Sequence, residues 1–161
     1  MPTGEHGAPV QITAKTPGDY LEVMSKSVFQ TGISWAVVEK KWPEIKEAFK
    51  GFDAATVAGM SKKELAKLAE DPSVIRNKLK LAAIVGNARK IIELDDAHGS
   101  FRRYLRSHDD FDALVKSLRK EFKFLGDMGA YVFLYVVKEK VPPYEEFCES
   151  RGMKKPADSR R

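Results

Sequence analysis

Basic side chains gather ahead of a short turn in the last third of the chain. Lys116, Arg119, Lys120 and Lys123 precede the turn that ends at Gly126. Backbone N–H groups at the start of a helix after such a turn can hold a phosphate, and the nearby cations would add positive charge. A run of charge more commonly marks a solvated face. The residues alone therefore leave two interpretations open, a phosphate contact and an exposed basic surface.

Cysteine and histidine are too few for the common metal and nucleophile sites. Cys148 is the one cysteine, which excludes an internal disulfide, and the histidines are His6, His98 and His108. A structural Cys/His zinc site takes four such ligands in a characteristic spacing, which this chain lacks. No Cys/His pair suggests a redox or nucleophilic site. We therefore expect no metal and no cofactor.

The composition is that of one globular domain. The chain has 161 residues, of which 43% are hydrophobic and 32% are charged. A chain of this length can bury a stable hydrophobic core without disulfides or bound metal ions. No apolar run approaches the ~20 residues of a membrane span, and residues 1–15 lack the apolar stretch of a signal peptide. We expect a cytoplasmic protein without membrane association, and the net charge of +5 permits a nucleic-acid partner without identifying one.

The chain divides into three parts by composition. Residues 1–15 contain Gly, Pro and Thr without periodicity and are predicted to form a flexible N-terminal arm. Residues 151–161 form a basic C-terminal tail without an apolar face. The body between them, residues 16–150, shows no internal repeat and no linker, so we expect it to fold as one helical domain.

The body is predicted to be all-α. Thr16 before Pro17 is a helix start signal, Ser34 can cap a helix that begins at Trp35, and Pro43 is predicted to open a separate short helix. Further helices are expected from a capping box at Ser61–Glu64, from apolar periodicity over residues 78–94, from an N-cap at Asp109 or Asp110, and over residues 130–137 and 144–149. The composition of residues 130–137 also suits a strand, but no partner strand is evident, so a buried helix is predicted.

Three segments, in this order and at these distances, carry a family resemblance. The first is Phe-Gln-Thr-Gly-Ile-Ser-Trp at residues 29–35, the second lies within residues 75–89 and ends in Ala-Ile-Val-Gly-Asn-Ala-Arg, and the third is Phe-Lys-Phe-Leu-Gly at residues 122–126. Together they resemble the DNA-3-methyladenine glycosylase I family of helix-hairpin-helix glycosylases. The resemblance covers roughly residues 19–140 and implies a helix-hairpin-helix glycosylase-like helical bundle.

The resemblance implies roles for the first segment. A glycosylase flips a base out of the duplex, fills the gap and reads the base in a pocket. Ile33 at the tip of a tight turn would be the wedge, Gln30 would occupy the vacated position, and Trp35 would be the wall on which the flipped base stacks. From the residues alone, a core aromatic and a packed isoleucine are the commoner interpretation. The resemblance favours base binding for Trp35. DNA contacts are predicted for the turn from Lys123 to Gly126 and for the nearby Lys120, because backbone N–H groups and cations there can hold a phosphate.

The chain departs from the family at several positions. Members usually carry a glutamate that reads the methylated adenine three residues before the glutamine, and Ser27 stands there. The general hairpin pattern is Gly-x-Gly, whereas this chain has Gly126, Asp127 and Met128. Asp127 can instead cap the following helix. The family's pocket tyrosine near the N-terminus and its Cys/His zinc clip have no counterpart.

These departures leave the catalytic group open. The candidates for the catalytic group are Glu22, Ser27, Glu145 and Glu146. Glu22 lies near the apolar side of its helix, which is unusual for an unpaired carboxylate. Glu145 and Glu146 lie beyond the hairpin, in the neighbourhood where the wider superfamily places an aspartate. Asn87, off the apolar stripe of its helix, suits a structural bond to a loop as well as a DNA contact.

The leading hypothesis is a monofunctional base-excision repair glycosylase that acts as a monomer on double-stranded DNA with a damaged base. It would flip an alkylated purine such as 3-methyladenine and hydrolyse its N-glycosidic bond with water, without a lyase step. An N-alkylated purine is already a cationic leaving group, so little acid catalysis is needed. The alternative is a helix-hairpin-helix protein that binds damaged or distorted DNA and has lost catalysis, and a protein-interaction scaffold is a third interpretation.

Overall fold

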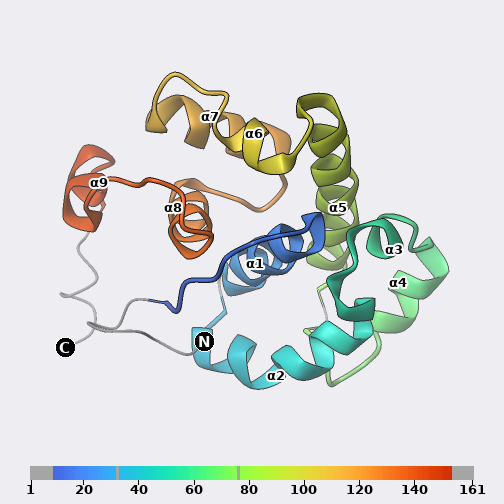
Figure 1. Cartoon of the computed structure of the whole chain (residues 1–161). Helices are drawn as coiled ribbons and strands as arrows, with labels where there is room; N and C mark the ends of the chain where they lie inside the picture. The colour runs from blue at the N-terminus through green and yellow to red at the C-terminus, as the bar shows by residue number, and fades with distance from the viewer. Residues whose placement is uncertain (1–8, 32, 76, 154–161) are drawn as a thin grey trace.

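The computed structural model describes residues 9–31, 33–75 and 77–153, and their regular structure is helical (Figure 1). This confirms the all-α prediction. In chain order the elements are α1 (Pro17–Gln30), α2 (Trp35–Ala48), the 3-10 turn η2 (Lys50–Phe52), α3 (Ala54–Ala58), α4 (Lys62–Leu68), α5 (Lys78–His98), α6 (Phe101–Leu105), α7 (Phe111–Glu121), α8 (Asp127–Val136) and α9 (Tyr144–Ser150).

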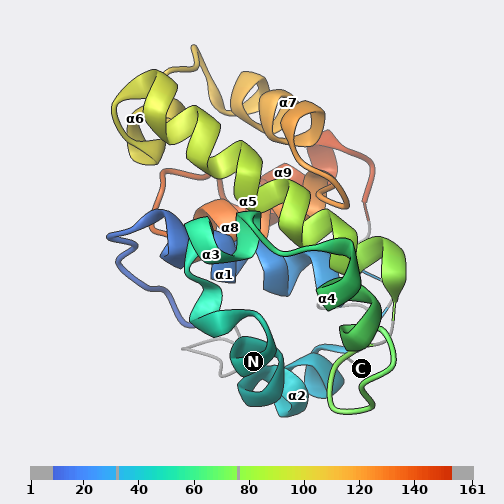
Figure 2. The ribbon, with the colours of Figure 1, turned by 90° about the vertical axis from the view of Figure 1, so that its right-hand side faces the viewer.

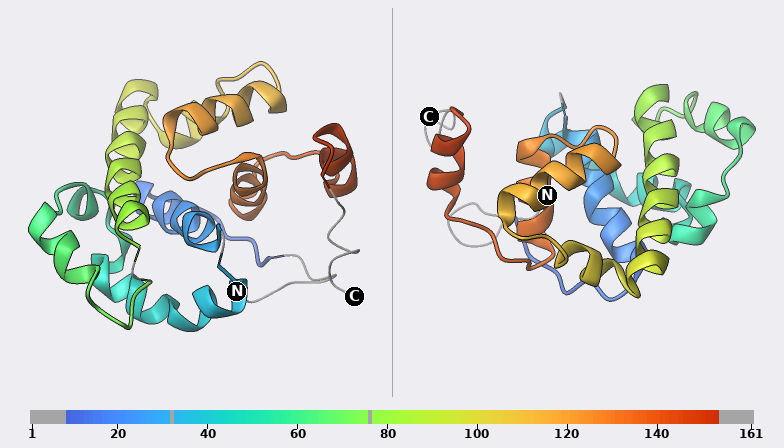
Figure 3. Two further views of the ribbon diagram at one scale, coloured as in Figure 1. Left: turned by 180° about the vertical axis from the view of Figure 1, so that it is seen from behind. Right: turned by 90° about the horizontal axis from the view of Figure 1, so that it is seen from above.

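Helix α1 runs through the middle of the molecule. It packs against α5 on one side and α8 on the other, and the further views show the remaining helices distributed around this trio (Figures 2 and 3). Its residues are buried around most of the helix, including Leu21, Met24, Val28 and Phe29 at 0% exposure. A helix that is covered on several sides holds its C-terminal end in a fixed place, and that end becomes one wall of the site described below.

The local start signals in the sequence are confirmed. Thr16 and Asp19 form a capping box at α1, and the Ser34 hydroxyl accepts a hydrogen bond from the backbone N–H of Val37 at 3.2 Å. Ser61 and Glu64 form the predicted capping box of α4, and Asp110 is the N-cap of α7. Such caps satisfy N–H groups that a helix leaves unpaired at its start.

The prediction that Pro43 opens a separate helix is wrong. Helix α2 continues through Pro43 to Ala48 as a single element. Val38, Trp42 and Ile45 are buried along one face on both sides of the proline, so the packed stripe is continuous. This tertiary packing outweighs the local preference of proline for a helix start.

Residues 130–137 form the predicted buried helix, not a strand, within and just after α8. Ala130, Phe133 and Leu134 are fully buried. On its far side Tyr131 packs on Phe147 of α9, with ring centroids 4.5 Å apart. Helix α8 is therefore covered on both sides, which explains why residues 130–137 are apolar throughout.

Residues 9–15, part of the predicted flexible arm, lie along the helical body. The N–H of Ile12 donates to the carbonyl of Val136 at 2.8 Å, and Arg102 donates to the carbonyl of Ala14 at 3.2 Å. The remainder of that arm, residues 1–8, and residues 154–161 of the predicted tail lie outside the described residues. The division of the chain into arm, body and tail stays a prediction. No helix in the described part of the chain is long and apolar enough to cross a membrane.

Candidate functional site

An open cavity of about 630 Å³ lies between the C-terminal end of α1 and the turn that joins α7 to α8. One wall comes from α1, the segment after it and the start of α2, and the other comes from the end of α7, the turn and the first turns of α8. The lining residues are Ser27, Gln30, Thr31, Trp35, Arg119, Phe122, Phe124, Leu125, Gly126, Asp127, Met128, Gly129 and Val132. Four of the predicted catalytic, base-binding and DNA-binding residues therefore meet here: Ser27, Gln30, Trp35 and Gly126.

Trp35 is at the cavity and not in the core. It is the first residue of α2, directly after the Ser34 cap, and 38% of its surface is exposed. The other tryptophan, Trp42, is 5% exposed and stacks on Phe52 with ring centroids 5.3 Å apart. An exposed indole on the wall of a cavity is available for stacking.

Ile33, in contrast, does not line the cavity. It is partly buried and packs against the hydrophobic core, and its N–H donates to the carbonyl of Gln30 at 3.3 Å. Gly32, which precedes it, lies outside the described residues. The wedge role of Ile33 stays a prediction.

The α7–α8 turn presents an aromatic side chain at its tip. Phe122 and Leu125 are buried and anchor the turn, whereas Phe124 is 41% exposed and lines the cavity. Phe124 has a φ of +58°, a left-handed conformation that is uncommon for a residue other than glycine. Gly126 is the N-cap of α8, without a side-chain cap hydrogen bond.

Asp127 does not cap α8, contrary to the prediction. Its carboxylate instead pairs with Arg119 at 3.0 Å and with Arg151 at 3.5 Å. Because these guanidinium groups flank it, the charge of Asp127 is balanced inside the cavity wall. Arg151 is the first residue of the predicted basic tail. The residues around it in the sequence do not indicate that it pairs with Asp127, which lies much earlier in the chain.

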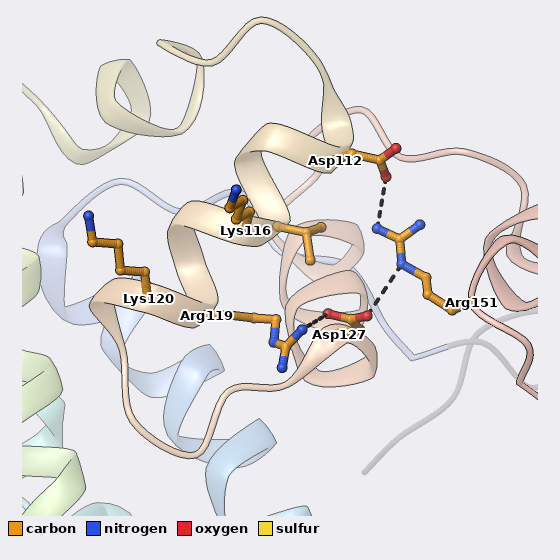
Figure 4. A pocket seen from close by; sticks show the side chains of 7 residues that line it. Asp112, Lys116, Arg119, Lys120, Asp127 and Arg151 are labelled. Carbon is orange, nitrogen blue, oxygen red and sulfur yellow. Dashed lines mark hydrogen bonds and ion pairs between the residues drawn. The ribbon is translucent and has the colours of Figure 1, made fainter.

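A second cavity, of about 580 Å³, adjoins the first between α7, the start of α8 and Arg151 (Figure 4). Lys116, Arg119, Lys120 and Arg151 supply its cations, and Asp112 and Asp127 supply its carboxylates. Arg151 also pairs with Asp112 at 2.8 Å. The two arginines are thus matched by carboxylates, while Lys116 and Lys120 are exposed. Lys123 is also exposed, in the turn itself.

The carboxylates predicted as catalytic candidates do not line the cavity between α1 and the α7–α8 turn. Glu22 accepts a hydrogen bond from the indole Nε1 of Trp42 at 2.9 Å and forms an ion pair with Lys46 at 3.2 Å, so it is a structural partner between α1 and α2. Glu145 and Glu146 are exposed at the start of α9. Among the described residues that line the cavity, Asp127 is the one with a carboxylate. The position of Asp127 in the cavity wall was not predicted from the sequence.

Ser27 lies where α1 and α8 approach each other closely. It is 7% exposed, and a Cβ placed on Gly129 would lie 3.8 Å from the Cβ of Ser27 and 3.2 Å from Leu125. Gly129 thus allows the two helices to come together at the floor of the cavity. This contact joins distant segments and has no local signature in the sequence.

The residues present do not fit a Cys/His zinc clip. No group of three or more His, Cys, Asp or Glu side chains in the described ranges could hold a metal ion, and Cys148 is buried. The expected absence of metal stays a prediction.

Comparison with known proteins gives one consistent result. Residues 13–122 match the methyladenine glycosylase family. The chain is 30% identical over 126 residues to DNA-3-methyladenine glycosylase 1 of Escherichia coli (strain K12). This match covers 65% of this chain and 67% of that protein. The chain is 29% identical over 126 residues to the DNA-3-methyladenine glycosylase of Haemophilus influenzae, covering 65% of this chain and 68% of that protein.

A solved structure gives the same answer for the fold. The 3-methyladenine DNA glycosylase I of Staphylococcus aureus, studied for its recognition of 3-methyladenine, superposes with a TM-score of 0.71 at 25% identity. The match covers 80% of this chain and 79% of that chain. The resemblance drawn from three short segments is thereby confirmed over most of the helical body.

Proposed function

The chain belongs to the methyladenine glycosylase family, and we propose that the cavity between α1 and the α7–α8 turn is where it receives the flipped base. It is a 3-methyladenine DNA glycosylase of base-excision repair, a monofunctional enzyme that breaks the N-glycosidic bond. Its partner is DNA that carries a damaged base, and we expect the protein to act on it as a monomer.

The shape and lining of the cavity support this assignment. A base must leave the stack before an enzyme can act on its glycosidic bond, and a flipped base is read by stacking and by polar contacts. The cavity offers exposed aromatic surface from Trp35 and Phe124, and the polar side chains of Ser27, Gln30 and Thr31. Stacking on an aromatic side chain contributes about 1–3 kcal/mol per base.

Cleavage of the N-glycosidic bond of an alkylated purine requires little from the protein beyond positioning of the base. An N-alkylated purine carries a positive charge and leaves as a neutral base, so the bond weakens without a strong general acid. Water is then the nucleophile. Asp127 supplies a carboxylate at the cavity wall, but Arg119 and Arg151 balance its charge. We infer that binding and exclusion of undamaged bases make the larger contribution, and that Ser27 reads the base through a hydroxyl where a carboxylate would bind a cation more strongly.

The exposure of Trp35 at the cavity carries this proposal, and substitution of that residue tests it. Trp35→Ala should abolish release of 3-methyladenine from methylated duplex DNA while the helical circular dichroism spectrum stays unchanged, because the indole is not part of the core. Trp35→Phe keeps an aromatic face and should retain part of the activity.

Two results would contradict the assignment. Release of base by Trp35→Ala at the wild-type rate would show that the base stacks elsewhere. Tight binding of the wild-type protein to abasic DNA without any base release would favour the alternative, a damage-binding protein that has lost catalysis.

A further inference from the structure

Helix α5 carries two buried polar side chains that contact the two walls of the base cavity. Lys80 is 5% exposed and Asn87 is 1% exposed, and the described residues that line the cavity include none from α5. The two positions lie about two helical turns apart on one helix, which separates them by about 10 Å along its axis. Their partners are the segments that form opposite walls.

Lys80 holds the wall that carries Trp35. Its ammonium group donates to the carbonyl of Phe29 at 3.4 Å and to the carbonyl of Thr31. These carbonyls lie at the C-terminal end of α1, where unpaired acceptors and the helix dipole favour a cation. Burial lowers the pKa of Lys80. A buried lysine is costly for the fold, so an apolar residue of similar length would suit stability alone at least as well.

Asn87 holds the opposite wall. Its side-chain oxygen accepts from the N–H of Lys123 at 2.9 Å, and its side-chain nitrogen donates to the carbonyl of the same residue at 3.2 Å. This pair of bonds fixes the backbone directly before Phe124, whose left-handed conformation needs support from its surroundings. The structural interpretation of Asn87 therefore prevails over a direct DNA contact.

We propose that Lys80 and Asn87 are positioning residues of the glycosylase, which use α5 as a common frame to set the separation between the Trp35 wall and the Phe124 turn. This inference rests on the proposed function of the cavity. Neither side chain touches the base; each acts through the backbone segment that it holds. A small displacement of such a wall is expensive for catalysis, because a shift of about 1 Å can cost about 100-fold in rate.

The test compares Lys80→Met and Asn87→Leu with Lys90→Met, a matched change on the same helix at a residue that pairs with Glu93. The measurements are the single-turnover rate of base release from methylated duplex, the affinity for undamaged duplex, the melting temperature, and the NMR signals of the Trp35 indole and the Lys123 amide in the free protein.

Lys80→Met should shift the Trp35 indole signal and slow base release by about 100-fold, with unchanged affinity for undamaged duplex, because the basic face of α7 is untouched. Asn87→Leu should expose the Lys123 amide to faster hydrogen exchange and reduce both base release and duplex affinity. Lys90→Met should match the wild type in every measurement.

Two outcomes would overturn the inference. The first is wild-type rates of base release with unmoved signals in both variants. The second is a parallel loss of melting temperature, duplex affinity and base release in Lys80→Met, which would mean a merely structural lysine. If the wild-type protein releases no base, the proposed function fails, and the Trp35 and Lys123 signals still decide the positioning role: unmoved signals contradict it, and shifted signals support it.

Discussion

Among the described residues that line the proposed base cavity, Ser27 is the polar one whose side chain is buried. It lies at the floor of the cavity, beside Gly129, in the position where the resemblance led us to expect a glutamate. A hydroxyl can exchange a hydrogen bond with a base but gives a cation less stabilisation than a carboxylate does. The position therefore tests how much of the activity depends on recognition of positive charge.

We predict that Ser27→Glu raises the release of 3-methyladenine from methylated DNA, because it restores a carboxylate to a cavity that is open to solvent. Ser27→Gln is the matched control, since it adds the same bulk without charge. High-performance chromatography of the released bases measures both. Equal release by the two variants would show that charge at this position is irrelevant, and a loss of fold in both would show that α1 and α8 cannot separate there.

At the scale of elements, α7 and the turn after it present the exposed lysines of the molecule's candidate DNA-binding surface. Asp112 and Asp127 are paired with Arg151 and Arg119, so the positive charge that remains for DNA on this face comes chiefly from lysine. This explains why a count of basic residues in the sequence overestimates the charge that this face offers.

Lys120→Glu should weaken binding to damaged and undamaged duplexes alike, and flatten the dependence of affinity on salt concentration, because fewer counterions are released. Lys67→Glu makes the same charge change on α4, away from α7 (Figure 1), and should leave the salt slope unchanged. Fluorescence anisotropy over a series of salt concentrations gives the slopes. The same slope for Lys120→Glu and the wild type would identify this face as solvated surface only.

Elements are predictable from sequence where their signals are local. The caps at Thr16, Ser34 and Ser61 depend on residues within one turn, so the sequence alone locates each of them. Helices α3 and α6 have five residues each, too few to show a period, and the sequence did not predict them.

Contacts between distant segments could not be predicted from the same signals. Glu22 meets the indole of Trp42, and Arg151 reaches Asp112 across most of the last third of the chain. Such contacts depend on how helices pack and not on the residues beside them in sequence. The cavity itself was predictable only in part: the resemblance identified Ser27, Gln30 and Trp35, whereas Phe124, Asp127 and Gly129 became apparent only once α8 was placed against α1.

The whole molecule brings together two segments from opposite ends of its helical body. α1 is covered by α5 on one side and by α8 on the other, and the base cavity forms where the end of α1 faces the start of α8. We propose that a damaged base enters that cavity and stacks on Trp35. The chain contains two tryptophans, one exposed at the cavity and one buried in the core, so each indole reports on a different place.

Titration of the ¹⁵N-labelled protein with free 3-methyladenine, followed through the two indole N–H signals, measures whether the base binds at Trp35. Trp35→Phe assigns the signals by removing one of them. The Trp35 signal should shift progressively and saturate, because the base stacks on that ring, while the signal of buried Trp42 should stay in place. A Trp35 signal that remains unmoved while the base binds would show that the base stacks elsewhere.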